Sequence, residues 1–164
     1  MCFFFKKLSA KEVYDFFNDV WKRLEMKGLP DKKSRNSENY AVSPYNTLKK
    51  EKCAYTMHVN CGKWRLHYNS YYDVKKKSVH FTVWYINLTI TNPELQKQLR
   101  DVFKDFSFTF MPSAVIISSK DFPVKKIEDV KSAVSTFATQ WDKSGIYDVL
   151  NRYKTNDELK NVKY

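Results

Sequence analysis

The 164-residue sequence predicts an α+β fold, with an antiparallel sheet of four or five strands packed against three to four helices. Three observations lead to this class. Residues 53–90 alternate apolar and polar side chains with a period of two, which is typical of half-buried strands. Apolar residues on either side of this stretch recur at helical spacing. Strands that follow one another directly, with helices between the strand groups, are typical of α+β folds.

The alternating stretch is expected to form a three-stranded meander at the centre of the sheet. A two-residue turn at residues 61–62 would pair Met57 with Leu66 and would set His67 diagonal to His58. In that register every pair on one face of the hairpin is apolar or aromatic. The hydrophobic pattern and the turn chemistry therefore agree.

A second hairpin through residues 74–77 continues the meander. With Asp73 opposite Ser78, it pairs Tyr72 with Val79. One face of the meander is then apolar, and the other is basic and aromatic. That second face carries Lys63, Arg65, His67, Asn69 and Tyr71 from the middle strand, flanked by His58, His80, Thr82 and Trp84.

Helices are expected before and after the meander. Ser9 and Glu12 form a capping box at the start of the first helix, and Gly28 is placed to end it. Asn92 can cap a second helix, with Pro93 in its first turn. The remaining expected elements are one or two strands within residues 107–118, a third helix from about residue 127 to Gly145, and a short last helix.

The length suits one domain over residues 1–164, since a chain of this size buries roughly 70% of its unfolded surface in a single core. A polar and basic connection occupies about residues 29–52. Long connections of this kind in compact domains are usually functional or mobile. Residues from about 155 to 164 are expected to be a frayed tail.

Positive charge is concentrated in one part of the sequence. The net charge is +11, and residues 22–80 hold +9 of it. Such a balance favours a polyanionic partner, because the positive field should lie on one side of the folded chain. The hydrophobic content of 43% excludes disorder as the main state.

The three cysteines, at positions 2, 53 and 61, do not suggest a disulfide framework. Cys53 and Cys61 bracket an expected strand and would lie about 26 Å apart, well beyond bridging distance. We therefore expect a reducing, intracellular location in the cytoplasm. No apolar run reaches 18 residues, so we expect no membrane-spanning helix and no membrane partner.

The sequence offers weak support for catalysis or metal binding. Its three histidines fall on one expected face but too far apart to hold one ion, and no Gly-rich phosphate loop is present. Acidic triplets such as residues 73–75 and 129–131 are not selective for two-metal chemistry. Cys61 has no matching histidine. We expect no cofactor, no metal and no enzymatic activity, with a nuclease-like enzyme as a minor alternative.

The favoured function is a non-enzymatic, basic nucleic-acid-binding protein that uses phosphate contacts and aromatic stacking on DNA or RNA. The alternative is a protein-interaction module, such as an inhibitor or adaptor of the kind encoded by phages or mobile elements, that acts on a nucleoprotein complex. Both hypotheses use the same surface. The residues expected to contact nucleic acid or a partner are Lys32, Lys33, Arg35, Lys49, Lys50, Lys63, Arg65, His67, Tyr71, Lys75, Lys76, Lys77, His80 and Trp84.

Overall fold

The computed structural model describes residues 6–29, 40–42, 47–61 and 64–155. In chain order the elements are α1 (Ala10–Arg23), β1 (Tyr40–Val42), β2 (Thr47–Leu48), β3 (Lys52–Cys61), β4 (Trp64–Asp73), β5 (Ser78–Ile86), α2 (Pro93–Val102), β6 (Ser107–Met111), β7 (Ala114–Ser118), β8 (Phe122–Pro123), α3 (Ile127–Ser144) and α4 (Ile146–Thr155). All strand pairs are antiparallel. The predicted α+β class is confirmed.

The sheet has more strands than the four or five predicted. Within the described residues, eight strands join it, in the order β1-β3-β4-β5-β7-β6, with β2 paired to β3 and β8 paired to β5. Three of these strands have only two or three residues, which is too short to show a period-two pattern. Two of the short strands, β1 and β2, lie within the 29–52 stretch that the sequence predicts to be a loop.

The first hairpin of the meander has a different register from the predicted one. Cys61 lies opposite Trp64, and Met57 pairs with Tyr68 rather than with Leu66. The strands are offset by two positions, so every side chain keeps its predicted face. The alternation of apolar and polar side chains also repeats every two residues. An offset of two positions therefore leaves the pattern unchanged, and the sequence cannot reveal it. One consequence is that His67 lies directly opposite His58.

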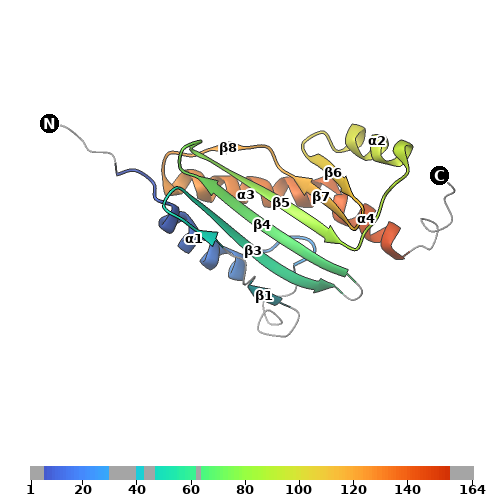
Figure 1. Ribbon diagram of the computed structural model, residues 1–164, viewed down its shortest axis with the longest axis horizontal. Helices are drawn as coiled ribbons and strands as arrows, with labels where there is room; N and C mark the ends of the chain where they lie inside the picture. Colours follow the sequence, from blue (N-terminus) through green and yellow to red (C-terminus); the bar gives the residue numbers. More distant parts are fainter. Residues whose placement is uncertain (1–5, 30–39, 43–46, 62–63, 156–164) are drawn as a thin grey trace.

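The second hairpin has the predicted register. Asp73 lies opposite Ser78, and Tyr72 lies opposite Val79. Beyond it, β7 pairs with β5 and β6 pairs with β7, which extends the sheet past the meander. The central strands β3, β4 and β5 are the longest of the sheet, and they form its middle in Figure 1.

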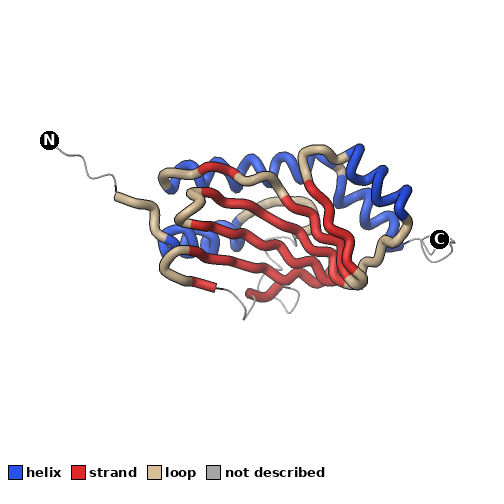
Figure 2. Tube along the Cα trace, turned by 45° about the horizontal axis from the view of Figure 1, so that its top comes forward, coloured by secondary structure: helices blue, strands red, loops and turns tan. Residues whose placement is uncertain are grey.

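Helices α1 and α3 pack on one face of the sheet and lie behind it in Figure 1. Figure 2 shows the sheet and the helical layer from a second direction. Phe17 of α1 and Phe137 of α3 both contact Phe81 of β5, with ring centroids 6.3 and 4.7 Å apart. Helix α4 packs on α3, and α2 packs beside β6. Within the described ranges, no helix is long and apolar enough to cross a bilayer.

The predicted helix signals are mostly confirmed. Ser9 and Glu12 form the capping box of α1, Asn92 caps α2, and α3 ends at Gly145 with a φ of 75°. Helix α1 ends at Arg23 and not at Gly28. Gly28 instead has a close-approach role, because a Cβ built on it would lie 2.2 Å from the Tyr68 hydroxyl oxygen.

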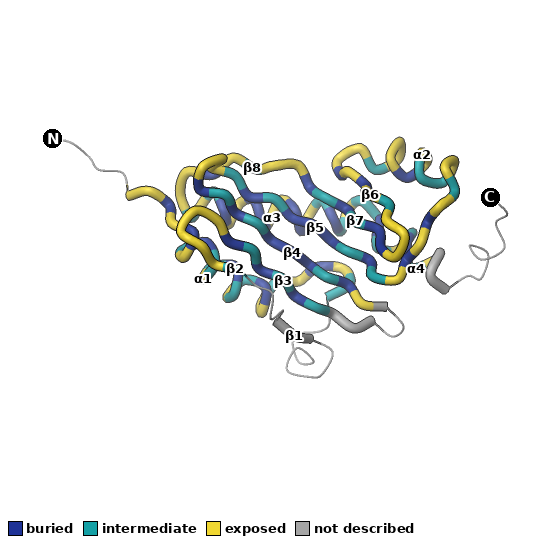
Figure 3. The backbone as a smooth tube through the Cα atoms, viewed as in Figure 1, coloured by how far each residue is buried: buried dark blue, intermediate teal, exposed yellow. Residues whose placement is uncertain are grey.

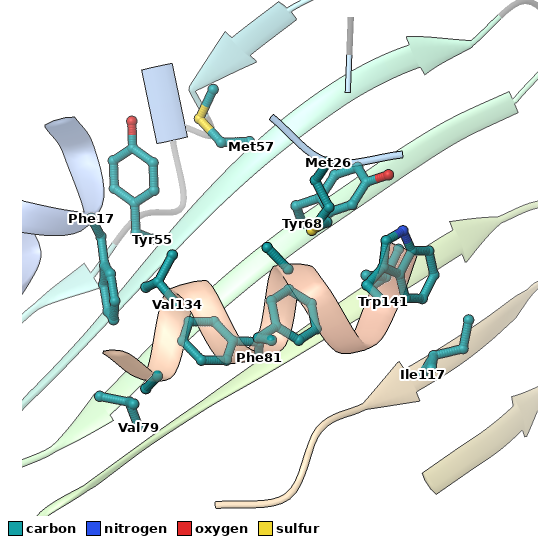
Figure 4. Packing of buried hydrophobic residues seen from close by; sticks show 14 of the residues in the cluster. Phe17, Met26, Tyr55, Met57, Tyr68, Val79, Phe81, Ile117, Val134 and Trp141 are labelled. Carbon is teal, nitrogen blue, oxygen red and sulfur yellow. The ribbon is translucent and has the colours of Figure 1, made fainter. Parts of the chain in front are cut away.

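The core between the sheet and the helices is aromatic and fully packed. Figure 4 shows Tyr68, Phe81 and Trp141 within it. Its two buried indoles have polar partners: Trp21 Nε1 donates to Ser70 Oγ at 2.7 Å, and Trp141 Nε1 donates to the Lys27 carbonyl at 3.0 Å. Because their N–H groups are satisfied, these large rings can be buried without a desolvation penalty.

Candidate functional site

The open face is the face of the sheet turned away from α1 and α3. In the described part of the chain, no helix lies on it, and Figure 3 views it directly. Arg65 is exposed, and Trp84 is half-buried by its neighbours on the sheet. The side chains of the face include Ala54, Thr56 and His58 of β3, Arg65, His67, Asn69 and Tyr71 of β4, His80, Thr82, Trp84 and Ile86 of β5, and Ile116 of β7.

The first feature of the open face is a stack of two histidine rings. His58 and His67 lie opposite each other on β3 and β4, with ring centroids 4.0 Å apart and planes 5° from parallel. Each of the two rings therefore covers one face of the other. Trp84 is the next residue in the same cross-strand row.

The histidine stack is neutral at pH 7. Burial, followed by the charges of His58 and Arg65, lowers the pKa of His67 to about 4. Burial and Arg65 also lower the pKa of His58. His67 Nε2 is buried without a hydrogen-bond partner among the described residues. The stack therefore adds nothing to the positive field on which the nucleic-acid hypothesis depends.

A hydrogen-bonded row of polar side chains follows next along the strands. Thr56 Oγ1 donates to Asn69 Oδ1 at 2.7 Å, and Asn69 Nδ2 donates to Thr82 Oγ1 at 2.9 Å. Trp84 Nε1 donates to the same threonine oxygen at 3.0 Å. Asn69 and Thr82 are buried. The row fixes the rotamers across three strands, so we assign it a structural role.

A second ring stack lies beyond the polar row. Tyr71 and His80 lie opposite each other on β4 and β5, with centroids 4.6 Å apart and planes at 15°. Pairing of β8 with β5 brings Asp121 near this stack, with its Oδ1 3.7 Å from His80 Nδ1. Burial lowers the pKa of His80 although Asp121 opposes the shift, and burial raises the pKa of Tyr71.

Lysines gather at this end of the sheet from two separate connections. We refer to six exposed lysines together as the basic end: Lys49, Lys50, Lys52, Lys75, Lys76 and Lys77. A backbone bond holds the two connections together, since the Val74 amide donates to the Glu51 carbonyl at 2.8 Å. Within the first connection, the Lys49 amide donates to the Lys52 carbonyl at 2.9 Å. The charges therefore converge because of the backbone and not because of their own side chains.

Two acidic residues lie among these lysines and have local partners. Asp73 Oδ1 accepts hydrogen bonds from the amides of Lys75 and Lys76, at 2.9 and 3.1 Å, which lowers the pKa of Asp73. Glu51 forms an ion pair with Lys75 at 3.1 Å. Six lysines against two acidic residues leave the basic end strongly positive.

A cavity of about 380 Å³ opens between the second ring stack and the basic end. It spans the sheet from β2 to the start of β8. Its lining residues are Thr47, Lys49, Lys52, Cys53, Ala54, Tyr71, Tyr72, Asp73, Lys76, Ser78, His80 and Asp121. Its volume and mixture of aromatic, charged and hydroxyl groups fall in the range of small-ligand sites.

The structure brings together seven of the predicted binding residues and separates the others. Tyr71 and His80 lie beside Lys49, Lys50 and Lys75–Lys77. Arg65, His67 and Trp84 lie toward the opposite end of the strands. Arg65 is eight residues from Asp73 along β4, or about 26 Å in an extended strand. Four further predicted residues lie outside the described ranges: Lys32, Lys33, Arg35 and Lys63.

Lys52, Ala54 and Asp121 line this cavity and are not among the predicted binding residues. Lys52 lies opposite Asp73, and Ala54 lies opposite Tyr71. The correct register of the first hairpin would have placed both of them. Asp121 precedes a two-residue strand that leaves no pattern in the sequence, so no signal could have found it.

Two other chemistries find little support in the described residues. They contain no group of three or more His, Cys, Asp or Glu that could hold a metal ion. The Cys53 thiol is buried, and burial raises its pKa to about 12, so it is a poor nucleophile.

Comparisons with models of protein families, with curated proteins and with solved structures find no match to this chain.

Proposed function

We propose that this chain is a non-enzymatic nucleic-acid-binding protein whose basic end holds phosphates and whose open face contacts bases. One observation carries the proposal. Six exposed lysines from two connections converge beside the Tyr71–His80 stack, and three of them, Lys49, Lys52 and Lys76, line a cavity with it. Cationic groups next to aromatic rings are the combination that single-stranded nucleic acid requires.

Phosphate contacts are expected to supply most of the affinity. Lysine side chains are long, flexible point charges, and they can follow a phosphate backbone without reading its sequence. Each contact releases condensed counterions, so binding should weaken steeply as salt is added. The three histidines of the face have lowered pKa values, so the positive field at pH 7 comes from lysine and arginine alone.

The geometry limits how bases can stack on the open face. His58 and His67 cover one face of each other's ring, as do Tyr71 and His80. Only the outer faces and the edges of these rings are left for a ligand. The open face therefore supports contacts at particular rings and not a flat platform across the whole sheet.

The direct test reverses the charge at the hairpin tip. In a mobility-shift titration with a single-stranded 12-mer, Lys75→Glu, Lys76→Glu and Lys77→Glu combined should abolish retention at 0.1 M salt. The matched control combines Lys22→Glu, Lys104→Glu and Lys143→Glu, three exposed lysines outside the basic end. If both triple variants lose affinity equally, the basic end is not the binding site.

A protein partner is the second candidate, and an apolar strip on the open face favours it. Ile86 and Ile116 lie beside Trp84, and Met111 at the sheet edge is 43% exposed. Apolar and aromatic anchors of this kind are common in protein interfaces. If wild type fails to retain unrelated oligonucleotides at low salt, this candidate replaces the first. An intracellular, reducing location is part of either proposal.

A further inference from the structure

The two faces of the Tyr71 ring have different neighbours. On β5, His80 stacks against one face. On β3, the residue opposite Tyr71 is Ala54, and the residue opposite Ala54 on β2 is Thr47. A methyl group is too small to cover an aromatic ring. Among the described residues of this row, no ring or long side chain therefore faces the β3 side of Tyr71.

The space beside Tyr71 has the thickness of a planar ring. Strands β4 and β2 are two strand spacings apart, or roughly 9.6 Å. A base stacked on Tyr71 and packed against Thr47 would need about 7 Å, which is two spacings of roughly 3.4 Å. Tyr71, Ala54 and Thr47 all line the 380 Å³ cavity, so the row opens into it.

In the other stack, the ring on the same strand as Tyr71 lacks such a space. His67 has His58 on one side and Trp84 on the other, so aromatic residues flank it in both directions. Its row also lies away from the six lysines. Tyr71 is thus the ring that combines a small neighbour with a cavity lined by lysines.

We propose that this cavity is a slot for one unpaired nucleobase, which stacks on the Tyr71 face turned toward Ala54 and extends the Tyr71–His80 stack. This inference rests on the proposed nucleic-acid function and deepens it. Lys49, Lys52 and Lys76 line the same cavity and can reach the phosphates on either side of the base. A paired base cannot enter, so the slot selects single strands.

The test separates base stacking from charge. Fluorescence anisotropy would compare a labelled oligothymidylate 12-mer with an abasic 12-mer of equal charge at 0.1 M salt. Wild type should bind the base-bearing strand about tenfold more tightly, in line with the loss found when a stacking side chain is truncated. Ala54→Leu should fill the slot and reduce the ratio to about one, while affinity for the abasic strand stays unchanged.

Two further variants complete the test. Thr109→Leu adds the same kind of side chain to the open face on β6, outside the cavity, and should keep the tenfold ratio. Tyr71→Leu removes the ring without adding bulk over Ala54, and should also reduce the ratio to one. Thermal unfolding would check that each variant is folded.

The possible failures differ in what they overturn. Equal binding of both strands by wild type would contradict the slot and leave the proposed phosphate binding intact. A tenfold ratio retained in both Ala54→Leu and Tyr71→Leu would have the same consequence. Absence of binding to either strand at low salt would overturn the proposed function and the slot with it.

Discussion

The two ring stacks of the open face have the same cross-strand geometry and different surroundings. His58–His67 lies between Trp84 and the edge strands, and partial burial lowers the pKa of His67 to about 4. Tyr71–His80 lies beside a small residue, a cavity and six lysines. Ring stacking alone therefore does not mark a ligand site. What distinguishes the second stack is a cavity next to a ring, lined by three lysines.

Charge reversal at the two ends of the open face should reduce the affinity for nucleic acid unequally. The loss of affinity at the basic end is the largest effect expected. The Lys75–Lys77 triple reversal removes three phosphate contacts, each worth about 0.7 in the salt slope for a single strand, so affinity at 0.1 M should fall roughly 100-fold. Arg65→Glu, near the histidine stack, should cost less than tenfold. Oligonucleotide titrations measure both.

An Arg65→Glu loss as large as that of the triple variant would contradict the comparison. The binding surface would then extend over both stacks, and the two stacks would not differ in function.

Acid should destabilise the protein through the histidine stack. His67 binds a proton near pH 4 when folded and near pH 6.5 when unfolded, so the unfolded state takes up more protons between these values. Stability should therefore fall as the pH is lowered from 6.5 to 4, by about 2 kcal/mol after allowance for partial exposure of the ring. Urea unfolding at several pH values measures this loss.

Substitution isolates the contribution of His67. His67→Asn should flatten the stability profile between pH 6.5 and 4. His80→Asn should change it less, because Asp121 opposes the shift at His80. A wild-type profile that is flat over this range would show that the histidine stack is not desolvated in the folded protein.

Disruption of the polar row between the two stacks should have the next largest effect, which is on the free energy of unfolding. Asn69→Leu removes both hydrogen bonds that join β3, β4 and β5 through this side chain, and leaves Thr56 and Thr82 with lost partners. The expected cost is about 1 to 3 kcal/mol of unfolding free energy. Thr109→Leu, at an exposed position of the same face, should cost less than about 0.5 kcal/mol.

The Asp121 contact should have the smallest effect. Its carboxylate is 3.7 Å from His80 and largely exposed, so Asp121→Asn should change stability by less than about 1 kcal/mol. The same change should lower the pKa of His80 further, because it removes the group that favours the protonated ring. Proton NMR titration of the histidines reports this shift; an unchanged His80 pKa would mean that the pair does not form.

Much of the fold could be predicted from the sequence because its signals are local. The capping box at Ser9, the Asn92-Pro93 start and Gly145 each act within one turn of a helix. Strand faces followed from alternation. The number of strands could not be predicted, because β1, β2 and β8 gain their conformation from pairing with long strands and not from their own residues.

The candidate site was harder to predict because it depends on register. An offset of two residues preserves each face and changes every cross-strand neighbour, so the predicted register sets His67 diagonal to His58 and misses the pairing of Ala54 with Tyr71. The lysines were identified by charge alone. Their convergence depends on contacts between residues 49–52 and 73–77, which no local pattern reports.

The most direct measurement is the affinity of wild type for a single-stranded 12-mer between 50 and 300 mM salt. Contacts by the six lysines of the basic end predict that the logarithm of the association constant falls with the logarithm of salt, with a slope of about −4. A slope near zero, or no binding at 50 mM salt, would contradict the assignment of the basic end and the open face to nucleic acid.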